Sequence, residues 1–295
     1  MINQVKTSAA GKLMLLGEHA VVYGYPCLVT AINKKITVSI KKIPSQDIQL
    51  NSPIAPKSVY VAASVSKFFQ KYKFKSGLSI TTTSEFLPTL GLGSSSAVTV
   101  ATLKALAQLF EIQLNKSQLF DLAVSVVRSI HSQASGFDVA SAVYGGTIYY
   151  QIGKPVIQLP HRHLPLLVIY SGTKADTSSI VARVAALKVK NPAKVNNIFK
   201  SIASLVDKAK NAYLKSDWPT LGKLFNQNHQ LLIKLGVSTD KLDSLVNTAL
   251  NNGAYGAKLS GAGQGDCVIV LYQPKYRHRL SNALIKIGGK TLSVV

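Results

Sequence analysis

Acidic residues are scarce in this sequence. Its 295 residues include 12 Asp and Glu against 34 Lys and Arg, which gives a formal net charge of +22 at pH 7. The glutamates are Glu18, Glu85 and Glu111. Such a surplus of positive charge favours anionic partners, namely nucleic acid, an acidic membrane surface or phosphorylated small molecules. Where acids are so few, a carboxylate beside a glycine-rich or apolar segment becomes a candidate functional group.

Cysteine and long apolar runs are also scarce. The two cysteines, Cys27 and Cys267, stand in apolar surroundings without metal-ligand spacing. This pattern argues against a disulfide framework and indicates buried free thiols in a reducing cytoplasm. The apolar runs are far too short to span a bilayer. A lysine precedes an apolar run near the N-terminus, but Lys12 and Glu18 interrupt that run, so we interpret the segment as mature structure and not as a signal peptide.

The basic residues are scattered along the chain. No arginine-rich tail occurs, and no interleaving of aromatic and basic residues of the kind that reads single-stranded nucleic acid. Lysine greatly outnumbers arginine, which suits a diffuse potential better than bidentate recognition. A solvated basic surface is therefore favoured over a nucleic-acid face, although a non-catalytic basic nucleic-acid-binding module stays open as a remote alternative.

The order of strand-like and helix-like patterns predicts two α+β lobes. Strand patterns lead in the first half, helical spacing dominates residues 195–250, and strand patterns return in "AKLSG", "CVIVLY" and "TLSVV", with a helix near "RHRLSNALIKI". Such an order is typical of an α+β architecture. We place the lobe boundary at 163/164, so that residues 1–163 form the N-terminal lobe and residues 164–295 the C-terminal lobe.

The stretch "GLGSSSA", residues 91–97, places glycines and serines where a strand pattern gives way to a helix. Gly91 and Gly93 permit backbone conformations and close approaches that side chains forbid. The N–H groups at the start of the helix form a natural phosphate site, and serine hydroxyls suit Mg²⁺. An ordinary turn with a serine N-cap fits the same letters. This stretch is no Walker A loop, because G-x-x-x-x-G-K-[ST] is absent from the chain.

Two further segments hold candidate charged groups. "GKLMLLGEHAVVYGYP", residues 11–26, carries Lys12 and Glu18 along an apolar run, either as an ion pair or as substrate contacts. "GFDVASA" places Asp138 among small apolar residues, where a carboxylate is costly unless it is paired or catalytic. A nearby lysine would hold such an aspartate ionised and stabilise a developing alkoxide.

A second glycine-dense turn, "SGAGQGDC" at residues 260–267, leads into a strand pattern. It indicates backbone packed closely against a loop or a ligand, although a plain tight connection also fits. Because it precedes a strand, it is not a dinucleotide fingerprint.

In their order and spacing, these segments resemble the three motifs of the GHMP kinase superfamily and, within it, the archaeal-type mevalonate kinases. The resemblance runs from about residue 8 to the C-terminus, and His19 in "GEHAVVYG" favours the mevalonate kinases. It implies a ribosomal-protein-S5-like N-terminal lobe and a ferredoxin-like C-terminal lobe. It also implies transfer of phosphate from ATP, with Mg²⁺, to the C5 hydroxyl of mevalonate in isoprenoid biosynthesis by a cytoplasmic enzyme.

The resemblance also implies roles for individual residues. Asp138 matches the catalytic aspartate, Lys12 the lysine that pairs with it, and Glu18 and His19 match positions at the substrate pocket. Ser95 matches the serine that binds Mg²⁺. The remaining ATP-binding positions are Gly91, Leu92, Gly93, Ser94, Ser96, Gly261, Ala262 and Gly263. Phosphoryl transfer needs mainly in-line positioning and charge neutralisation, which this set of residues could supply.

Three features depart from the family pattern. Val127 stands eleven residues before Asp138, where the family usually has a glutamate ligand for Mg²⁺. Gln264 and Asp266 stand where mevalonate kinases normally have glycine. "FDVASAVYGG" is closer to phosphomevalonate kinases, so 5-phosphomevalonate remains the alternative acceptor. No membrane partner is expected, nucleic acid is disfavoured, and a homodimer is compatible with this interpretation.

The other polar candidates have structural interpretations. We expect His161 and His163 to be solvated, and His131 and His229 to be partly buried in helices. Ser117 and Thr177 are predicted to be helix caps.

Overall fold

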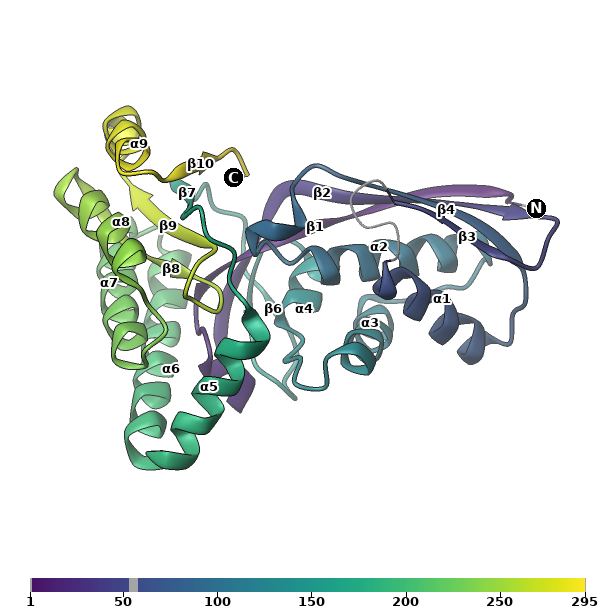
Figure 1. The fold of residues 1–295 in the computed structure, drawn as a ribbon, viewed down its shortest axis with the longest axis horizontal. Coiled ribbons are helices and arrows are strands. Elements are labelled where there is room, and N and C mark those ends of the chain that lie inside the picture. Colours follow the sequence, from purple (N-terminus) through teal and green to yellow (C-terminus); the bar gives the residue numbers. More distant parts are fainter. Residues whose placement is uncertain (1, 53–57, 295) are drawn as a thin grey trace. The chain divides into compact units, whose positions relative to one another are not determined.

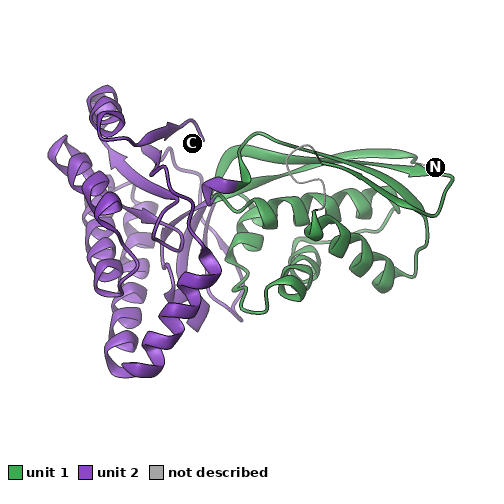
Figure 2. Ribbon diagram, in the orientation of Figure 1, with its two compact units in different colours: residues 1–12, 31–88, 92–145 green, residues 13–30, 89–91, 146–295 purple. Residues whose placement is uncertain are grey.

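The computed structural model describes residues 2–52 and 58–294, and the chain within them divides into two compact units (Figure 2). The first unit comprises residues 1–12, 31–88 and 92–145. The second comprises residues 13–30, 89–91 and 146–295. The chain therefore passes between the units several times, and one passage falls inside the "GLGSSS" stretch, between Gly91 and Leu92.

Two long strands contribute residues to both units. Strand β1 extends over Gln4–Leu16 and pairs with β2, which extends over Cys27–Ile43. In the first unit, β2 pairs antiparallel with β4 so that Ile40 lies opposite Ile80, and β3 adds to β4 in parallel. The remaining elements of this unit are β3 (Ile48–Asn51), α1 (Val59–Tyr72), β4 (Gly77–Ser84), α2 (Ser94–Leu109), α3 (Lys116–Ile130) and α4 (Phe137–Tyr144).

Helices α1, α2 and α3 lie on one face of the first unit's strands (Figure 1). Helix α2 is the centre of this layer, and nearly all of its side chains from Ser96 onward are buried. Its many small residues, among them Ala97, Ala101 and Ala105, let the neighbouring helices approach closely. The burial of α2 fixes the position of its first turn, which follows the two glycines of the "GLG" sequence.

The second unit is built on a four-stranded sheet of order β10-β7-β9-β8. Its central strands β7 and β9 pair antiparallel, with Val168 opposite Ile269, and every residue of β9 is buried. Continuous apolar runs such as "CVIVLY" are expected where both faces of a strand are covered. These strands are β7 (Leu166–Tyr170), β8 (Ala254–Ser260), β9 (Cys267–Tyr272) and β10 (Lys290–Leu292).

Helices α7 and α8 pack against β8, and α6 packs against α7 (Figure 1). The backbones of α7 and β8 approach closely at Gly222 and Gly256, where a Cβ on Gly256 would lie 1.9 Å from the Gly222 carbonyl oxygen. The helices are α5 (Thr177–Lys190), α6 (Pro192–Leu214), α7 (Trp218–Lys234), α8 (Asp240–Asn251) and α9 (Arg277–Lys286). Shorter elements are β5 (Thr147–Tyr150), β6 (Ile157–Gln158), η1 (Ala20–Tyr23), η2 (Pro88–Leu90) and η3 (Pro274–Tyr276).

The elements agree with the α+β prediction, with differences at two helix starts. Helix α3 begins after Asn115, whose side chain accepts from the Gln118 N–H in a capping box, so the prediction that Ser117 caps this helix is wrong. Helix α5 is capped by Asp176 and not by Thr177. In both cases a side-chain oxygen of Asn or Asp, upstream of the predicted cap, reaches the third N–H of the helix. The lobe boundary at 163/164 stays a prediction.

No helix in the described part of the chain is long and apolar enough to cross a membrane.

Candidate functional site

The "GLG" stretch forms a tight loop in front of α2. Gly93 stands at the N-cap with φ 78°, and no side chain caps the first turn, whose serine N–H groups therefore lack a side-chain partner at the cap position. A Cβ on Gly93 would lie 2.9 Å from Cγ of Lys12, and the backbone N–H of Lys12 donates to the Leu92 carbonyl at 2.8 Å. The loop thus has the uncapped helix start and bare backbone that an anion site requires.

Lys12 and Asp138 form an ion pair within the first unit. Lys12 Nζ lies 3.2 Å from Asp138 Oδ1, and the lysine is 6% exposed. Lys12 comes from β1, and Asp138 from the first turn of α4, where the helix dipole favours a carboxylate. Asp138 Oδ1 is buried, and among the described residues it has an ion-pair partner but accepts no hydrogen bond of good geometry. Asp138 Oδ1 is thereby held beside an ammonium group, and this oxygen can still accept a hydrogen bond from a further donor.

Tyr60 is a member of this cluster that the sequence did not indicate. It stands at the start of α1, its hydroxyl is hydrogen-bonded to the Ser95 side chain, and it lies in the field of Asp138. Partial burial raises the pKa of Tyr60 above its ordinary value, the Ser95 hydrogen bond opposes that shift, and the Asp138 charge adds to it. The structure therefore connects the loop serine with the aspartate region through a phenol that stays protonated.

Val127 lies on α3 with 7% of its surface exposed and forms part of the apolar core. Among the described residues, no group of three or more His, Cys, Asp or Glu side chains is arranged to hold a metal ion. An apolar side chain therefore stands at the position where the family pattern predicts a glutamate ligand for Mg²⁺.

Glu18 and His19 belong to a buried network in the second unit. Glu18 is 1% exposed, its Oε1 is paired with Lys258, and its Oε2 accepts from Asn228 Nδ2 at 2.9 Å. Burial raises the pKa of Glu18, and Lys258 opposes that shift. Glu18 therefore pairs with Lys258 of β8, whereas Lys12 pairs with Asp138, so the first motif contributes to two separate ion pairs.

His19 joins the first motif to the third motif. Its Nε2 lies 2.8 Å from the Ala262 carbonyl oxygen, and the residue has a positive φ of 60°. Burial lowers the pKa of His19, so that the neutral ring donates to this carbonyl at neutral pH. The contact fixes the position of the turn that contains Gly261, Ala262 and Gly263.

The third motif is a turn with unusual backbone. Gly261 and Gly263 have φ values of 109° and 87°, and a Cβ on Gly263 would lie 2.1 Å from the Val237 carbonyl oxygen. Gln264 and Asp266 also have positive φ, 56° and 55°. Two residues with side chains thus adopt the left-handed conformation that favours glycine.

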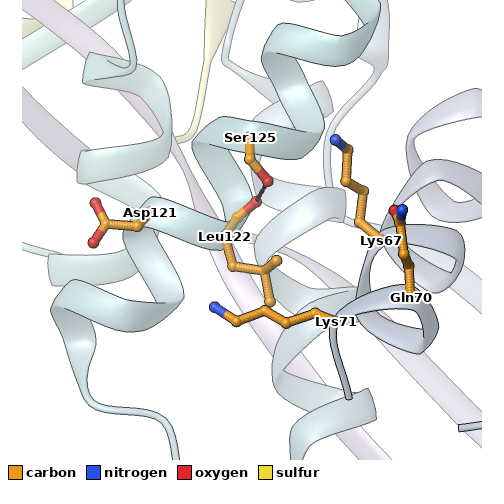
Figure 3. Close-up of a pocket in the computed structure, with 6 residues that line it drawn as sticks. All are labelled: Lys67, Gln70, Lys71, Asp121, Leu122 and Ser125. Atoms are coloured by element: carbon orange, nitrogen blue, oxygen red, sulfur yellow. Dashed lines mark hydrogen bonds between the residues drawn. The ribbon is translucent and has the colours of Figure 1, made fainter. Parts of the chain in front are cut away.

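Two pockets of the first unit contain none of the predicted site residues. One of about 300 Å³ lies between α1 and α3 and is lined by Lys67, Gln70, Lys71, Asp121, Leu122 and Ser125. Figure 3 shows Asp121 pointing away from Lys67 and Gln70, and the hydrogen bond drawn joins Ser125 to the Leu122 carbonyl of the same helix. Because its polar groups do not converge, this pocket does not compete with the Lys12–Asp138 region as a candidate site.

The histidines outside the motifs differ in environment. His229 of α7 is 1% exposed and bonded to Asp243, as expected for a structural histidine. His131 is exposed at the C-terminal end of α3, so the prediction that it is partly buried is wrong, because the helix ends there. His161 and His163 are exposed, as predicted.

Two domain models of one family match this chain. The model of the GHMP kinases N terminal domain matches residues 59–146, and that of the GHMP kinases C terminal domain matches residues 205–289. A mevalonate kinase from Pyrococcus horikoshii is 35% identical, with 98% of this chain and 94% of the relative covered.

Two solved structures show the same fold. The L. major mevalonate kinase in complex with R-mevalonate has a TM-score of 0.84 and 28% identity, with 96% of this chain and 91% of that chain covered. The Streptococcus pneumoniae phosphomevalonate kinase has a TM-score of 0.85 but 20% identity over 99% of both chains, so its likeness concerns the fold alone. With both domain models matched and a relative 35% identical across almost its whole length, the protein belongs to the GHMP kinase family.

Proposed function

We propose that this kinase transfers the γ-phosphoryl group of ATP to the C5 hydroxyl of mevalonate and yields 5-phosphomevalonate and ADP. The observation that carries the proposal is the 3.2 Å ion pair of Lys12 and Asp138 beside the phosphate loop of the first unit. It is supported by mevalonate kinase relatives that cover almost the whole chain.

In the proposed reaction, the C5 oxygen attacks the γ-phosphorus and forms the new O–P bond, while the bond to the bridging oxygen of ADP breaks. Asp138 accepts the hydroxyl proton, and Lys12 holds the carboxylate in place and stabilises the negative charge that develops on the attacking oxygen. Placing a donor and an acceptor at fixed positions is the main protein contribution to phosphoryl transfer.

The phosphate loop is proposed to bind the phosphates of ATP. Leu92, Gly93, Ser94 and Ser96 contribute backbone and hydroxyl groups at the start of α2, whose first turn carries no side-chain cap and no acidic residue. Gly91, Gly261, Ala262 and Gly263 belong to the second unit and are assigned to the same nucleotide-binding role.

Mg²⁺ is proposed to enter with ATP. The donor set fits a cation held mostly by phosphate oxygens and water, with Ser95 as the protein ligand, because Mg²⁺ commonly keeps several waters and needs few protein oxygens. When bound, the ion neutralises charge on the phosphates as the terminal phosphoryl group is transferred. Because Val127 supplies no oxygen, the proposal depends on the Ser95 hydroxyl as a ligand. The Tyr60 hydrogen bond orients that hydroxyl.

Glu18 and His19 are assigned to the substrate pocket, and their contacts support a different part for each. Both oxygens of Glu18 are engaged within the protein, so we propose that Glu18 stabilises residues of the substrate pocket without contacting the substrate. His19 is held by Ala262 and presents its ring beside the third motif.

The proposal includes a cytoplasmic location, which two buried cysteines without a disulfide favour, and no membrane or nucleic-acid partner. A homodimer is compatible with it, and light scattering of the purified protein measures the assembly directly.

The experiment is ADP release with ATP and Mg²⁺ in the presence of mevalonate, 5-phosphomevalonate or no acceptor. Turnover with mevalonate alone is the expected result. Turnover with 5-phosphomevalonate alone would instead assign the alternative acceptor, and ADP release that is independent of any acceptor would contradict both assignments.

A further inference from the structure

Asp266 is a densely bonded residue of the third motif, and the reaction proposed above does not use it. It is 3% exposed and has a positive φ of 55°, a conformation that favours glycine. A buried carboxylate at a left-handed backbone position is costly unless its contacts compensate for the loss of water.

The carboxylate and backbone of Asp266 bind the segment between β7 and α5. Oδ1 accepts from the Ala175 N–H at 3.1 Å and lies 3.2 Å from Lys174 Nζ. The Asp266 N–H donates to the Thr173 carbonyl, and its carbonyl accepts from the Ser171 N–H, both at 2.8 Å. These bonds compensate the burial of the charge and fix the direction of the side chain.

The other carboxylate oxygen faces the phosphate loop. A Cβ placed on Gly91 would lie 2.4 Å from Asp266 Oδ2 and 2.6 Å from its Cγ, so the glycine packs directly on the carboxyl group. The next residue, Cys267, directs its Sγ at the Leu90 carbonyl at 3.4 Å. All these residues belong to the second unit, so the contacts lie within one compact body.

We infer that Asp266 is a positioning residue that clasps the first glycine of the phosphate loop to the 171–175 segment, with Lys174 as the partner that keeps its carboxylate in place. The contact of Asp266 with Gly91 reduces the conformational freedom that Gly91 must lose when nucleotide binds. It therefore affects the affinity for ATP more than the rate of the chemical step.

The test compares Asp266→Gly, which removes the side chain and tolerates the positive φ, with Asp266→Asn, which keeps the shape and the tolerance for positive φ but removes the charge. Gln264→Gly is the matched control, because it places glycine at the neighbouring left-handed position, where Gln264 makes a backbone bond to Val237. The affinity for a non-hydrolysable ATP analogue is measured by calorimetry, together with KM and kcat.

We expect Asp266→Gly to weaken nucleotide affinity about tenfold, with kcat and the KM for mevalonate changed less than about twofold, and Asp266→Asn to lie between it and the unaltered protein. Lys174→Met is expected to weaken affinity in the unaltered background and to have no further effect beside Asp266→Gly, because Lys174 acts through Asp266. Thermal unfolding of each variant checks that it is folded.

Equal nucleotide affinities for Asp266→Gly and Gln264→Gly would overturn the inference, as would an effect of Lys174→Met that persists beside Asp266→Gly. If Asp266→Gly fails to fold, Asp266→Asn and Lys174→Met carry the same comparison. The inference rests on ATP binding in the proposed function, but calorimetry needs no acceptor. A protein that binds the analogue without phosphorylating mevalonate would therefore contradict the proposed acceptor. The nucleotide affinities of the variants would still decide whether Asp266 positions Gly91.

Discussion

At the scale of single residues, the proposed proton acceptor is the most direct target. Asp138→Asn keeps the size of the side chain but removes the charge that accepts a proton, so we expect kcat to fall by about 10³-fold while KM for ATP changes little. Asp121→Asn on α3 is the matched control, because Asp121 is an exposed acid of the same unit. Steady-state ADP release measures both variants, and a kcat for Asp138→Asn within about threefold of the unaltered enzyme would exclude the assigned role.

Tyr60 provides a second test at this scale. Tyr60→Phe keeps the ring but removes the hydroxyl bonded to Ser95, so we expect activity to fall about tenfold and the Mg²⁺ concentration for half-maximal activity to rise. Tyr72→Phe, at the other end of α1, is the control, since the Tyr72 ring packs on Phe68 away from the loop. Equal Mg²⁺ dependence in the two variants would show that the Tyr60 hydroxyl does not orient Ser95.

The sequence predicts part of this chemistry for a physical reason. An acid among small apolar residues must be paired or functional, and the structure pairs Asp138 with Lys12. The partner of Glu18 could not be predicted in the same way. Lys258 is fully buried in β8, and a lysine within an apolar strand pattern gives no indication of which distant acid it will meet. Tyr60 was not predicted because its helix carries no motif.

At the scale of elements, the start of α3 tests the corrected cap. Asn115→Ala removes the acceptor for the Gln118 N–H, so we expect a loss of about 1 kcal/mol in the free energy of unfolding. Ser117→Ala, at the cap position that the sequence suggested, is expected to change stability by less than about 0.5 kcal/mol. Denaturant unfolding of the two variants decides between them, and a larger loss for Ser117→Ala would restore the original cap.

Helix α7 carries a prediction about acid stability. Burial lowers the pKa of His229 below its ordinary value of 6.5, and Asp243 only partly opposes this shift. The unfolded chain therefore takes up a proton that the folded protein resists, so stability falls as pH drops below 6.5. The pKa of His19 is lowered for the same reason, and His19 acts in the same direction.

Melting temperature as a function of pH measures this effect, with His229→Gln as the variant. We expect its melting temperature to depend less steeply on pH below 6.5 than that of the unaltered protein, whatever its absolute value. Parallel curves for the two proteins would show that His229 does not contribute to the pH dependence.

At the scale of the whole molecule, the α+β class was predictable because periodicity reports burial, and β9 is the clearest case, with all six residues apolar and buried. Passage of the chain between units was not predictable. The sequence pattern shows that β1 and β2 are strands, but not that each contributes to two compact bodies. The division at Gly91 arises from tertiary contacts that leave no local signal.

The net charge of +22 gives the remaining prediction. Attraction of the anionic substrates to a basic protein is screened by salt, so we expect the KM for ATP and for mevalonate to rise with ionic strength while kcat changes little. A series of activity measurements at increasing salt checks this. KM values that do not change with salt would show that the charge has no part in substrate capture.

The measurement that tests the central claim most directly is proton-coupled ³¹P NMR of the product formed from ATP and mevalonate. We expect a phosphomonoester signal split into a triplet by two neighbouring CH₂ protons, because phosphate on the C5 oxygen is attached to a primary carbon. A phosphomonoester without that splitting would place the phosphate on the tertiary hydroxyl. The absence of any new ester beside free phosphate would show ATP hydrolysis, and either result would contradict the account.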